Sequence, residues 1–305
     1  MNIQWYPGHM TKARRAMKED MKLIDLVIEL VDARVPFSSR NPDIDELAAG
    51  KARMVLLNKA DLADKAKNAA WAALFESRGI HVAKIDARNK GSLKQVQAVI
   101  QEACKEKIER DRRRGILNRP IRTMVVGIPN VGKSTFINSF AGKACAKTGN
   151  KPGVTKGNQW IRLNKTLELL DTPGILWPRF EDQTVGLHLA LIGSINDQIL
   201  NREELAWELI GLLEQIYPGV LTERYGDAAE GETEDNSAWK ELSKEEQNLK
   251  ASRMLERIAK NRACLMKGGE LDLARASALL LDEFRSGKLG KLSLEQAQDY
   301  TDRVK

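Results

Sequence analysis

The sequence predicts an α/β fold, with a parallel-rich sheet flanked by helices, followed by a smaller all-helical domain. Over the first half of the chain, short β-rich apolar runs alternate with segments of helical periodicity, as in a parallel sheet. From about Gln183 onward, apolar residues recur at helical spacing and β-branched pairs are few. We therefore divide the 305 residues into a first domain over 1–182 and a helical domain over 183–305.

Each expected element follows from its local pattern. The strands are expected at 25–31, 52–57, 81–85, 122–126 and 166–170. Between the third and fourth strands, LKQVQAVIQEACKEKIERDRRRGIL has a long helical pattern that would bridge two halves of one sheet or link two domains. In the second half, helices are expected at 203–216 and 248–266, and the acidic stretch 223–239 between them is expected to be an exposed loop.

Composition and charge exclude several classes of protein. The net charge of +7 favours a polyanionic partner, with nucleic acid as the leading candidate, although a merely basic enzyme would look similar. The distant cysteines Cys104, Cys145 and Cys264 form no CxxC pair, which argues against a disulfide framework or a zinc site. No apolar run has the length of a membrane span and the N-terminus lacks a secretion signal, so we expect a cytoplasmic protein.

A phosphate-binding loop is predicted at GIPNVGKST, residues 127–135, which fits GxxxxGK[ST] between an expected strand and a helical pattern. Its glycines allow the amide hydrogens to turn inward onto phosphates, and the following helix adds its positive N-terminal end. Lys133 would reach the β- and γ-phosphates, and Ser134 would ligate Mg²⁺. The phosphate-binding residues expected in this loop are Gly127, Asn130, Val131, Gly132, Lys133, Ser134 and Thr135.

A second phosphate-sensing segment is expected at DTPG, which follows the strand at 166–170. Asp171 can hold a magnesium-bound water, and the Gly174 amide can sense a γ-phosphate. Between the two motifs, KPGVTKG places Thr155 in a loop containing Gly and Pro, where its hydroxyl is a further candidate magnesium ligand. The three expected metal ligands are therefore Ser134, Thr155 and Asp171.

The tetrapeptide NKAD at 58–61 predicts a guanine site. The Asp61 carboxylate can accept both donors on the N1 and N2 edge of guanine, which selects guanine over adenine. Asn58 would bond the base or the phosphate loop, and the stem of Lys59 would cover the ring. One strand later, the Ala87 amide could donate to the guanine carbonyl. By itself NKAD is better explained as a strand ending in a polar turn, and it is the phosphate loop that favours the guanine interpretation.

In this chain the base-reading motif precedes the phosphate-reading motif. With WYPGHM at 5–10, DARVPFSSRNP at 32–42, LLNKADL, GIPNVGKST, KPGVTKG and DTPGIL, the sequence resembles the circularly permuted GTPases, and within them the ribosome biogenesis GTPase A, or YlqF, family. The resemblance is dense over residues 1–180. It implies GTP hydrolysis to GDP, and late maturation of the large ribosomal subunit as the process. It also implies rRNA and ribosomal proteins as partners and release after hydrolysis. The sequence offers no amphipathic anchor, so we expect no membrane partner, and we expect a monomer off the ribosome.

The residues that would activate the attacking water are less evident. Ile175 and Leu176 follow DTPG, and neither side chain can orient a water, so we expect slow intrinsic hydrolysis. Lys133 would stabilise charge on the transferred phosphoryl group. Asn130 could hold a potassium ion or only stabilise the loop. His9, which follows a Pro-Gly turn, is catalytic according to the family resemblance, and a group from the partner is a third candidate.

Two basic clusters are candidate RNA contacts. Lys250, Arg253, Arg257 and Lys260 recur on one helical face, and Lys12, Arg14, Arg15 and Lys18 follow His9. A solvated helix face is the alternative explanation. Two other functions also remain open, namely an RNA-binding module with a structural nucleotide and a GTPase acting on a non-ribosomal RNA.

Overall fold

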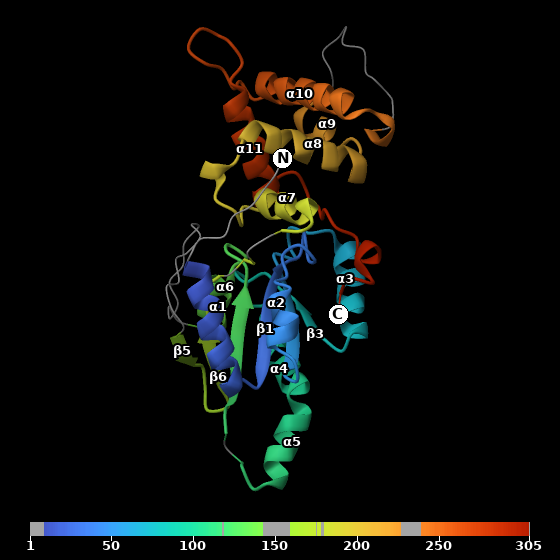
Figure 1. The fold of residues 1–305 in the computed structure, drawn as a ribbon. Helices are drawn as coiled ribbons and strands as arrows, with labels where there is room; N and C mark the ends of the chain where they lie inside the picture. Colours follow the sequence, from blue (N-terminus) through green and yellow to red (C-terminus); the bar gives the residue numbers. More distant parts are fainter. Residues whose placement is uncertain are drawn as a thin grey trace.

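The computed structural model describes residues 9–117, 119–142, 159–174, 176–177, 180–226 and 239–304, with the backbone alone at 9–14 and 240. Within these ranges the strands form a six-stranded sheet in the order β3-β2-β1-β4-β6-β5 (Figure 1). They are β1 Leu26–Asp32, β2 Ala52–Asn58, β3 His81–Lys84, β4 Ile121–Gly127, β5 Gln159–Arg162 and β6 Leu167–Asp171. Neighbouring strands are parallel, except that β5 is antiparallel to β6. The predicted α/β fold with a mostly parallel sheet is confirmed.

The predicted strands all occur, each within a residue of its expected ends, because their apolar runs are buried by the sheet. The short strand β5 is missing from the prediction. It lies at the edge of the sheet and only Ile161 among its four residues is buried, so its sequence has little strand signal. The long helical pattern after β3 is interrupted at Cys104, whose φ of −103° separates two helices. These helices form the crossover from β3 to β4 within one sheet.

Helices cover both faces of the sheet (Figure 1). The helices of the first half are α1 His9–Asp20, α2 Asp43–Leu47, α3 Lys65–Ser77, α4 Lys94–Ala103, α5 Lys105–Arg113 and α6 Lys133–Ala141, with the 3₁₀ turn η1 Met21–Leu23. Side chains of β2 alternate between two apolar clusters. Met54 shares one cluster with Ile100 of α4, whereas Val55 shares the other with Trp71 of α3. Burial on both faces explains why the central strands are almost continuously apolar.

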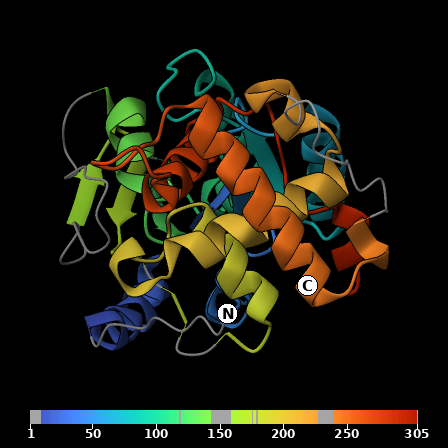
Figure 2. The same ribbon diagram turned by 90° about the horizontal axis from the view of Figure 1, so that it is seen from above.

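The second half of the chain is helical, as predicted. It contains α7 Gln183–Leu191, η2 Asp197–Ile199, α8 Arg202–Ile216, α9 Val220–Tyr225, η3 Trp239–Glu241, α10 Lys244–Asn261, α11 Leu273–Ser286 and η4 Ala297–Tyr300. Helix α10 begins four residues before the expected helix at 248–266, because Ser243 and Glu246 form a reciprocal capping box. It ends at Asn261, shortly before Ala263 adopts a φ of 49°. Figure 2 shows α10 crossing over the helical region.

The described ends of the acidic stretch 223–239 differ from the exposed loop that the sequence predicts. At its start Tyr225 belongs to α9 and is buried, and at its end Trp239 is buried against Gly211 of α8. Residues 227–238 lie outside the described part of the chain. Aromatic side chains at both ends pack into the helical core. The prediction missed this because it rested on the average polarity of the stretch.

The last residues of the chain return to the first half. Ala297 and Val304 join the apolar cluster around Trp71, and the ring of Tyr300 stacks on Phe37 with centroids 4.4 Å apart. The division of the chain between residues 182 and 183 stays a prediction, and these contacts show that residues 297–304 pack across it. In the described ranges, none of the helices combines the length and the apolar character needed to cross a bilayer.

Candidate functional site

The carboxyl ends of the parallel strands meet at one edge of the sheet, which is where open α/β sheets bind ligands. The base-reading motif begins at Asn58, the last residue of β2. The phosphate loop begins at Gly127, at the end of β4, and DTPG begins at Asp171, at the end of β6. Strand β1 lies between β2 and β4 and ends at Asp32. The sheet therefore brings together motifs that are far apart in the sequence.

The phosphate loop and NKAD are in direct contact. The side-chain amide of Asn58 donates from Nδ2 to the carbonyl oxygen of Val131 at 2.7 Å. Gly132 has a φ of 97°, and a Cβ atom there would lie 2.5 Å from Asn58 Nδ2, so glycine is required twice over. Helix α6 begins directly afterwards, at Lys133, with its positive N-terminal end toward the loop. Residues 130–135 thus have the backbone turn and helix start of an anion site.

Lys133 lies at the start of α6, where it is buried against β6. Its Nζ is 2.7 Å from Asp171 Oδ1 and also donates to the carbonyl oxygen of Thr172. Burial lowers the pKa of Lys133, because it disfavours the charged form, while the Asp171 carboxylate opposes that shift. The predicted phosphate-binding cation and the predicted metal-binding carboxylate are therefore neighbours.

The residues present fit a magnesium ion. Its preferred ligands are oxygens, and in phosphoryl-transfer sites one or two protein oxygens suffice beside those of the phosphates. Ser134 is half-buried in the first turn of α6, and Asp171 is buried at the end of β6. No cluster of three or more His, Cys, Asp or Glu that could hold a metal ion by itself occurs in the described residues. Thr155, the third predicted ligand, lies outside them.

The DTPG segment packs directly on the phosphate loop. A Cβ atom at Gly174 would lie 3.0 Å from the backbone of Pro129, so this approach favours glycine. The Thr172 hydroxyl donates to the carbonyl oxygen of Val125 in β4 at 2.8 Å. Leu176, two positions after Gly174, is fully buried. Ile175, which lies between them, is outside the described residues. Leu176 therefore offers no group that could orient a water.

The base-reading loop is surrounded by charged groups. Lys59 has a φ of 58°, and its Nζ lies 2.7 Å from Asp32 Oδ2. Burial lowers the pKa of Lys59, and Asp32 opposes this shift. Asp61 Oδ2 is 2.7 Å from the guanidinium of Arg88, which is largely exposed. Only Arg88 Nη2 contacts this carboxylate, and Asp61 Oδ1 is buried with no hydrogen-bond partner among the described residues. Asp61 therefore accepts one donor from Arg88, whereas the N1 and N2 edge of guanine would offer it two.

Two predicted contacts have different partners in the structure. The Ala87 amide, predicted to donate to the guanine carbonyl, donates to Asn58 Oδ1 at 2.9 Å. Asn130 Nδ2 donates to the carbonyl oxygen of Gly193, in the turn after α7, at 2.8 Å. The hydroxyl of Ser194 in the same turn donates to the Pro129 carbonyl oxygen, also at 2.8 Å. The phosphate loop is therefore tied to the helical half of the chain, which the sequence prediction did not anticipate.

The remaining predicted residues lie on α1 and α10. His9 is the first residue of α1, and its side chain, like those of Lys12 and Arg14, lies outside the described part of the structure. Arg15 is exposed. Figure 1 shows α1 beside the sheet and α10 on the far side of the helical region, so the two basic clusters are well separated.

The basic face of α10 is unevenly exposed. Arg253 and Lys260 are exposed, whereas Lys250 and Arg257 are half-buried near Glu214 of α8. Burial raises the pKa of Glu214, and the charges of Lys250 and Arg257 oppose that shift. Arg253 and Lys260 are consequently the two members of this face that point most fully into solvent.

Asp32 and Arg34, which surround the base-reading lysine, were missed as site residues. They belong to DARVPFSSRNP and follow a buried strand, as Asn58 does. Their position at the end of a buried strand, which Asn58 shares, could have identified them as candidate site residues. The order of the strands, which places β1 between the base-reading and phosphate-reading strands, is not encoded in sequence spacing.

Comparison with known proteins agrees with this geometry. A family model described as a 50S ribosome-binding GTPase matches residues 122–212. The ribosome biogenesis GTPase A of Bacillus cereus is 47% identical over 304 residues, covering 100% of this chain and 97% of the relative. That of Thermotoga maritima is 31% identical, covering 98% and 96%. The crystal structure of GNP-bound YlqF from T. maritima has a TM-score of 0.62 and 26% identity, covering 94% of this chain and 99% of that one. This chain therefore belongs to the ribosome biogenesis GTPase A family.

Proposed function

We propose that this protein hydrolyses GTP to GDP and phosphate at the edge of the sheet formed by β2, β4 and β6. The observation that carries the proposal is the position of Asn58. Its side chain donates to Val131 in the phosphate loop and accepts from Ala87, so one residue joins the base-reading and phosphate-reading loops. A P-loop that binds a different nucleotide does not require hydrogen bonds to an NKAD segment.

Each predicted residue has a role in this proposal. Asn58, Lys59, Asp61 and Ala87 bind guanine, with Asp61 as the selecting carboxylate. The Ala87 amide, which donates to Asn58 Oδ1 in the structure, would turn to the guanine carbonyl when the nucleotide binds. The phosphates are bound by Gly127, Asn130, Val131, Gly132, Lys133, Ser134, Thr135 and Gly174. Ser134, Thr155 and Asp171 would hold Mg²⁺, which would supply positive charge to offset the negative charge that develops on the phosphates. Lys133 and the N-terminal end of α6 stabilise negative charge on the transferred group.

Hydrolysis by the isolated protein is expected to be slow, because Ile175 and Leu176 are apolar at the positions just after DTPG, where Ras-like enzymes often place a water-orienting glutamine. We propose His9 and a potassium ion near Asn130 as the groups that complete the site. Asn130 donates through its amide nitrogen to Gly193, so a potassium ion would use the oxygen Oδ1.

The two groups can be separated by comparing partner-stimulated GTP turnover of His9→Ala and Asn130→Ala in potassium and in sodium. We expect turnover to fall about 10²-fold or more for His9→Ala in either salt, the magnitude of a lost acid, base or positioning group. Asn130→Ala should remove the advantage of potassium over sodium. Unchanged turnover in His9→Ala would rule out the histidine, and equal rates of the parent protein in both salts would rule out the cation.

We further propose that the partner is a late precursor of the large ribosomal subunit, bound in the GTP state through rRNA and ribosomal proteins and released after hydrolysis. The basic clusters support this, with Lys12, Arg14 and Arg15 on α1 and Lys250, Arg253, Arg257 and Lys260 on α10 as contacts to phosphates. The relatives are ribosome biogenesis GTPases, which supports a partner in ribosome assembly. We propose that the protein works in the cytoplasm and is a monomer off the ribosome.

Sedimentation with ribosomal subunits tests this proposal. The protein should cosediment with large-subunit precursors in a non-hydrolysable GTP analogue and much less in GDP. Reversing Arg253 and Lys260 together to Glu should weaken binding, and should reduce the slope of log K against log salt by about two. The matched control reverses two exposed lysines elsewhere, Lys65 and Lys165, and should leave both quantities unchanged. Binding that is absent, or equal in both nucleotides, would contradict the proposal.

A further inference from the structure

Strand β1 lies between the strands that carry the base-reading and phosphate-reading motifs. The segment that begins at its last residue, 32–42, has no role among those assigned so far. Asp32 is fully buried and accepts two hydrogen bonds from Arg34, from Nε and Nη2, each at 2.9 Å. It also accepts from Lys59 Nζ at 2.7 Å. Burial would raise the pKa of Asp32, but the charges and hydrogen bonds of Arg34 and Lys59 hold it well below its usual range. Asp32 is thus a fixed anion beneath the base-reading lysine.

Arg34 extends this arrangement into the helical half of the chain. Its remaining nitrogen, Nη1, donates to the carbonyl oxygens of Phe284 at 3.2 Å and Arg285 at 3.1 Å, in the last turn of α11. A cation is favourable there, because the last carbonyls of a helix have no partner within the helix and carry its negative end. Arg34 is only 1% exposed, so these contacts are shielded from solvent.

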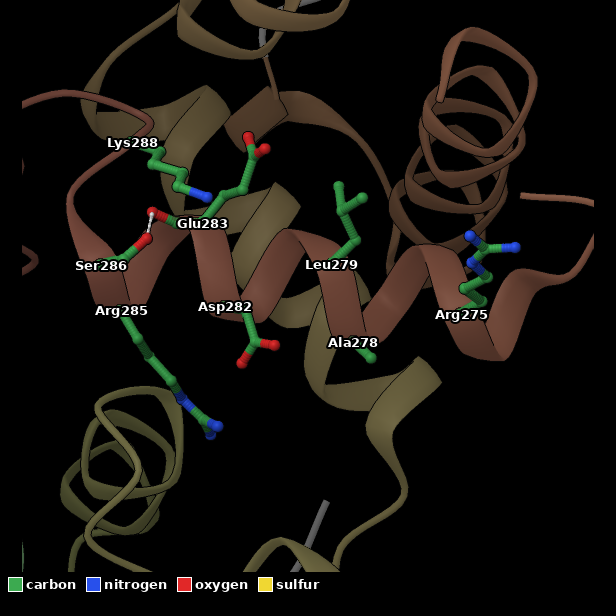
Figure 3. A pocket seen from close by; sticks show the side chains of 8 residues that line it. All are labelled: Arg275, Ala278, Leu279, Asp282, Glu283, Arg285, Ser286 and Lys288. Carbon is green, nitrogen blue, oxygen red and sulfur yellow. Dashed lines mark hydrogen bonds between the residues drawn. The ribbon is translucent and has the colours of Figure 1, made fainter. Parts of the chain in front are cut away.

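Arg285 continues the connection toward the phosphate loop. It donates to the carbonyl oxygens of Leu191 and Ala190 at the end of α7, and pairs with Asp197 at 2.7 Å. Figure 3 shows it reaching from α11 toward a neighbouring helix, away from Lys288, beside a cavity of about 700 Å³. The turn after α7 that Arg285 holds contains Gly193, the acceptor of Asn130 in the phosphate loop.

The rest of the segment is also anchored to distant parts of the chain. The amides of Phe37 and Ser38 donate to the carboxylate of Glu295 at 2.7 and 3.0 Å. The buried His188 of α7 lies 3.0 Å from the same carboxylate. Residues 32–42 therefore contact α7, α11 and the C-terminal segment at once.

We propose that Arg34 is a positioning residue that couples the guanine side of the site to the helical region. By fixing Asp32, Arg34 sets the position of Lys59, and through Nη1 it holds the last turn of α11. Nucleotide binding at Lys59 and movement of α11 are then linked, because one guanidinium serves both. The inference rests on the guanine-binding role proposed above for Asn58, Lys59 and Asp61.

The geometry makes arginine necessary at this position. A guanidinium presents two parallel donors to Asp32 and a further nitrogen to the helix carbonyls in one rigid plane. A lysine keeps the positive charge beside Asp32 but, as a point donor, does not reproduce the bidentate pair and the carbonyl contacts together. Arg34→Lys is therefore the informative variant, since it avoids leaving an uncompensated buried carboxylate.

Arg224→Lys supplies a matched control. Arg224 of α9 also makes a bidentate pair with a carboxylate of α11, to Glu283 at 2.8 and 3.0 Å, but lies in the helical region and has no contact with Asp32 or Lys59. Both variants replace a guanidinium that donates to α11, although Arg224 is 35% exposed and Arg34 only 1%. Arg34 alone also contacts Asp32, the partner of Lys59, so Arg224→Lys reports what loosening a contact to α11 does without that link.

The full-length variants are compared by two measurements. The first is the Kd of fluorescent GDP and ADP, which should rise about tenfold for GDP in Arg34→Lys, the loss of one charge-assisted hydrogen bond, and stay unchanged in Arg224→Lys. The second is amide hydrogen exchange of residues 284–290 without nucleotide and with saturating GDP. The parent protein and Arg224→Lys should show a GDP-dependent change there, and Arg34→Lys should not.

A double variant keeps the inference testable if Arg34→Lys is also less stable. In the Lys59→Ala background, Arg34→Lys should raise the Kd for GDP little further, because its effect passes through Lys59. Three results would each overturn the coupling. They are effects of the two substitutions that multiply in the Kd for GDP, an unchanged Kd for GDP in Arg34→Lys, and a GDP-dependent exchange response at 284–290 that persists in Arg34→Lys. If the parent protein failed to prefer GDP over ADP, the guanine-site proposal itself would fail. If the parent protein prefers GDP over ADP and Arg34→Lys binds GDP equally well, only the role of Arg34 would be overturned.

Discussion

Lys133→Met should lower GTP turnover by about 10²–10³-fold, the loss that accompanies removal of one preorganised donor to the reacting group. It should also lower the free energy of unfolding of the protein without nucleotide by about 3 kcal/mol. The reason is the buried pair with Asp171, since removing one partner leaves the other charge buried and uncompensated. Steady-state phosphate release and urea unfolding measure the two effects on the same preparation.

A second variant separates chemistry from stability. Lys133→Met combined with Asp171→Asn removes both charges, so most of the lost unfolding free energy should return while GTP turnover stays low. If the single variant unfolded like the parent protein, or if the double variant were no more stable than the single one, the pair would not be coupled as the 2.7 Å contact implies. Retained turnover in Lys133→Met would contradict its role at the phosphates.

Asp61→Asn should change the base preference from guanine to xanthine. In the proposed site the carboxylate of Asp61 would accept two donors from guanine, whereas an asparagine amide would donate to the 2-carbonyl of xanthine and accept from its N1–H. Loss of two hydrogen bonds to a charged group predicts a rise in the Kd for GDP of about 10²–10³-fold, with a gain for xanthosine diphosphate. Competition titrations with a fluorescent nucleotide measure both affinities.

Asp86→Asn is the control for this change. Asp86 lies close to Asp61 in space and pairs with the same Arg88, at 3.0 Å, so its replacement removes a similar charge from the same surface. It should leave the base preference intact. Because Arg88 is 65% exposed, its ion pairs contribute little to stability, and neither variant should unfold. An unchanged ratio of GDP to xanthosine diphosphate affinity in Asp61→Asn would exclude Asp61 as the selecting residue.

The sheet could be predicted because its central strands are buried on both faces, and such strands read as continuous apolar runs. β1 and β4 illustrate this, since nearly every residue of each is buried. β5 escaped prediction because an edge strand with one buried residue has no comparable signal. The end of α10 escaped because it depends on the backbone conformation of Ala263, and the apolar pattern continues past it.

The candidate site shows the same distinction. The motifs containing Asn58, Lys133 and Asp171 could be recognised because their chemistry requires particular residue types at fixed local spacing. The partners of Asn130 and Ala87, the contact of Asp32 with Lys59 and the contacts of Arg34 with α11 join residues 27 to 251 positions apart, and spacing along the chain contains no record of them.

The sequence by itself determined the α/β class, the positions of the nucleotide motifs and their permuted order, because these follow from local periodicity and local chemistry. Only the tertiary structure decided that β1 separates the base-reading and phosphate-reading strands, and that Arg34 joins this position to α11. It also decided that Lys250 and Arg257 are half-buried beside Glu214 while Arg253 and Lys260 face solvent. The physical reason is that strand order and burial arise from packing between distant segments, which no single segment specifies.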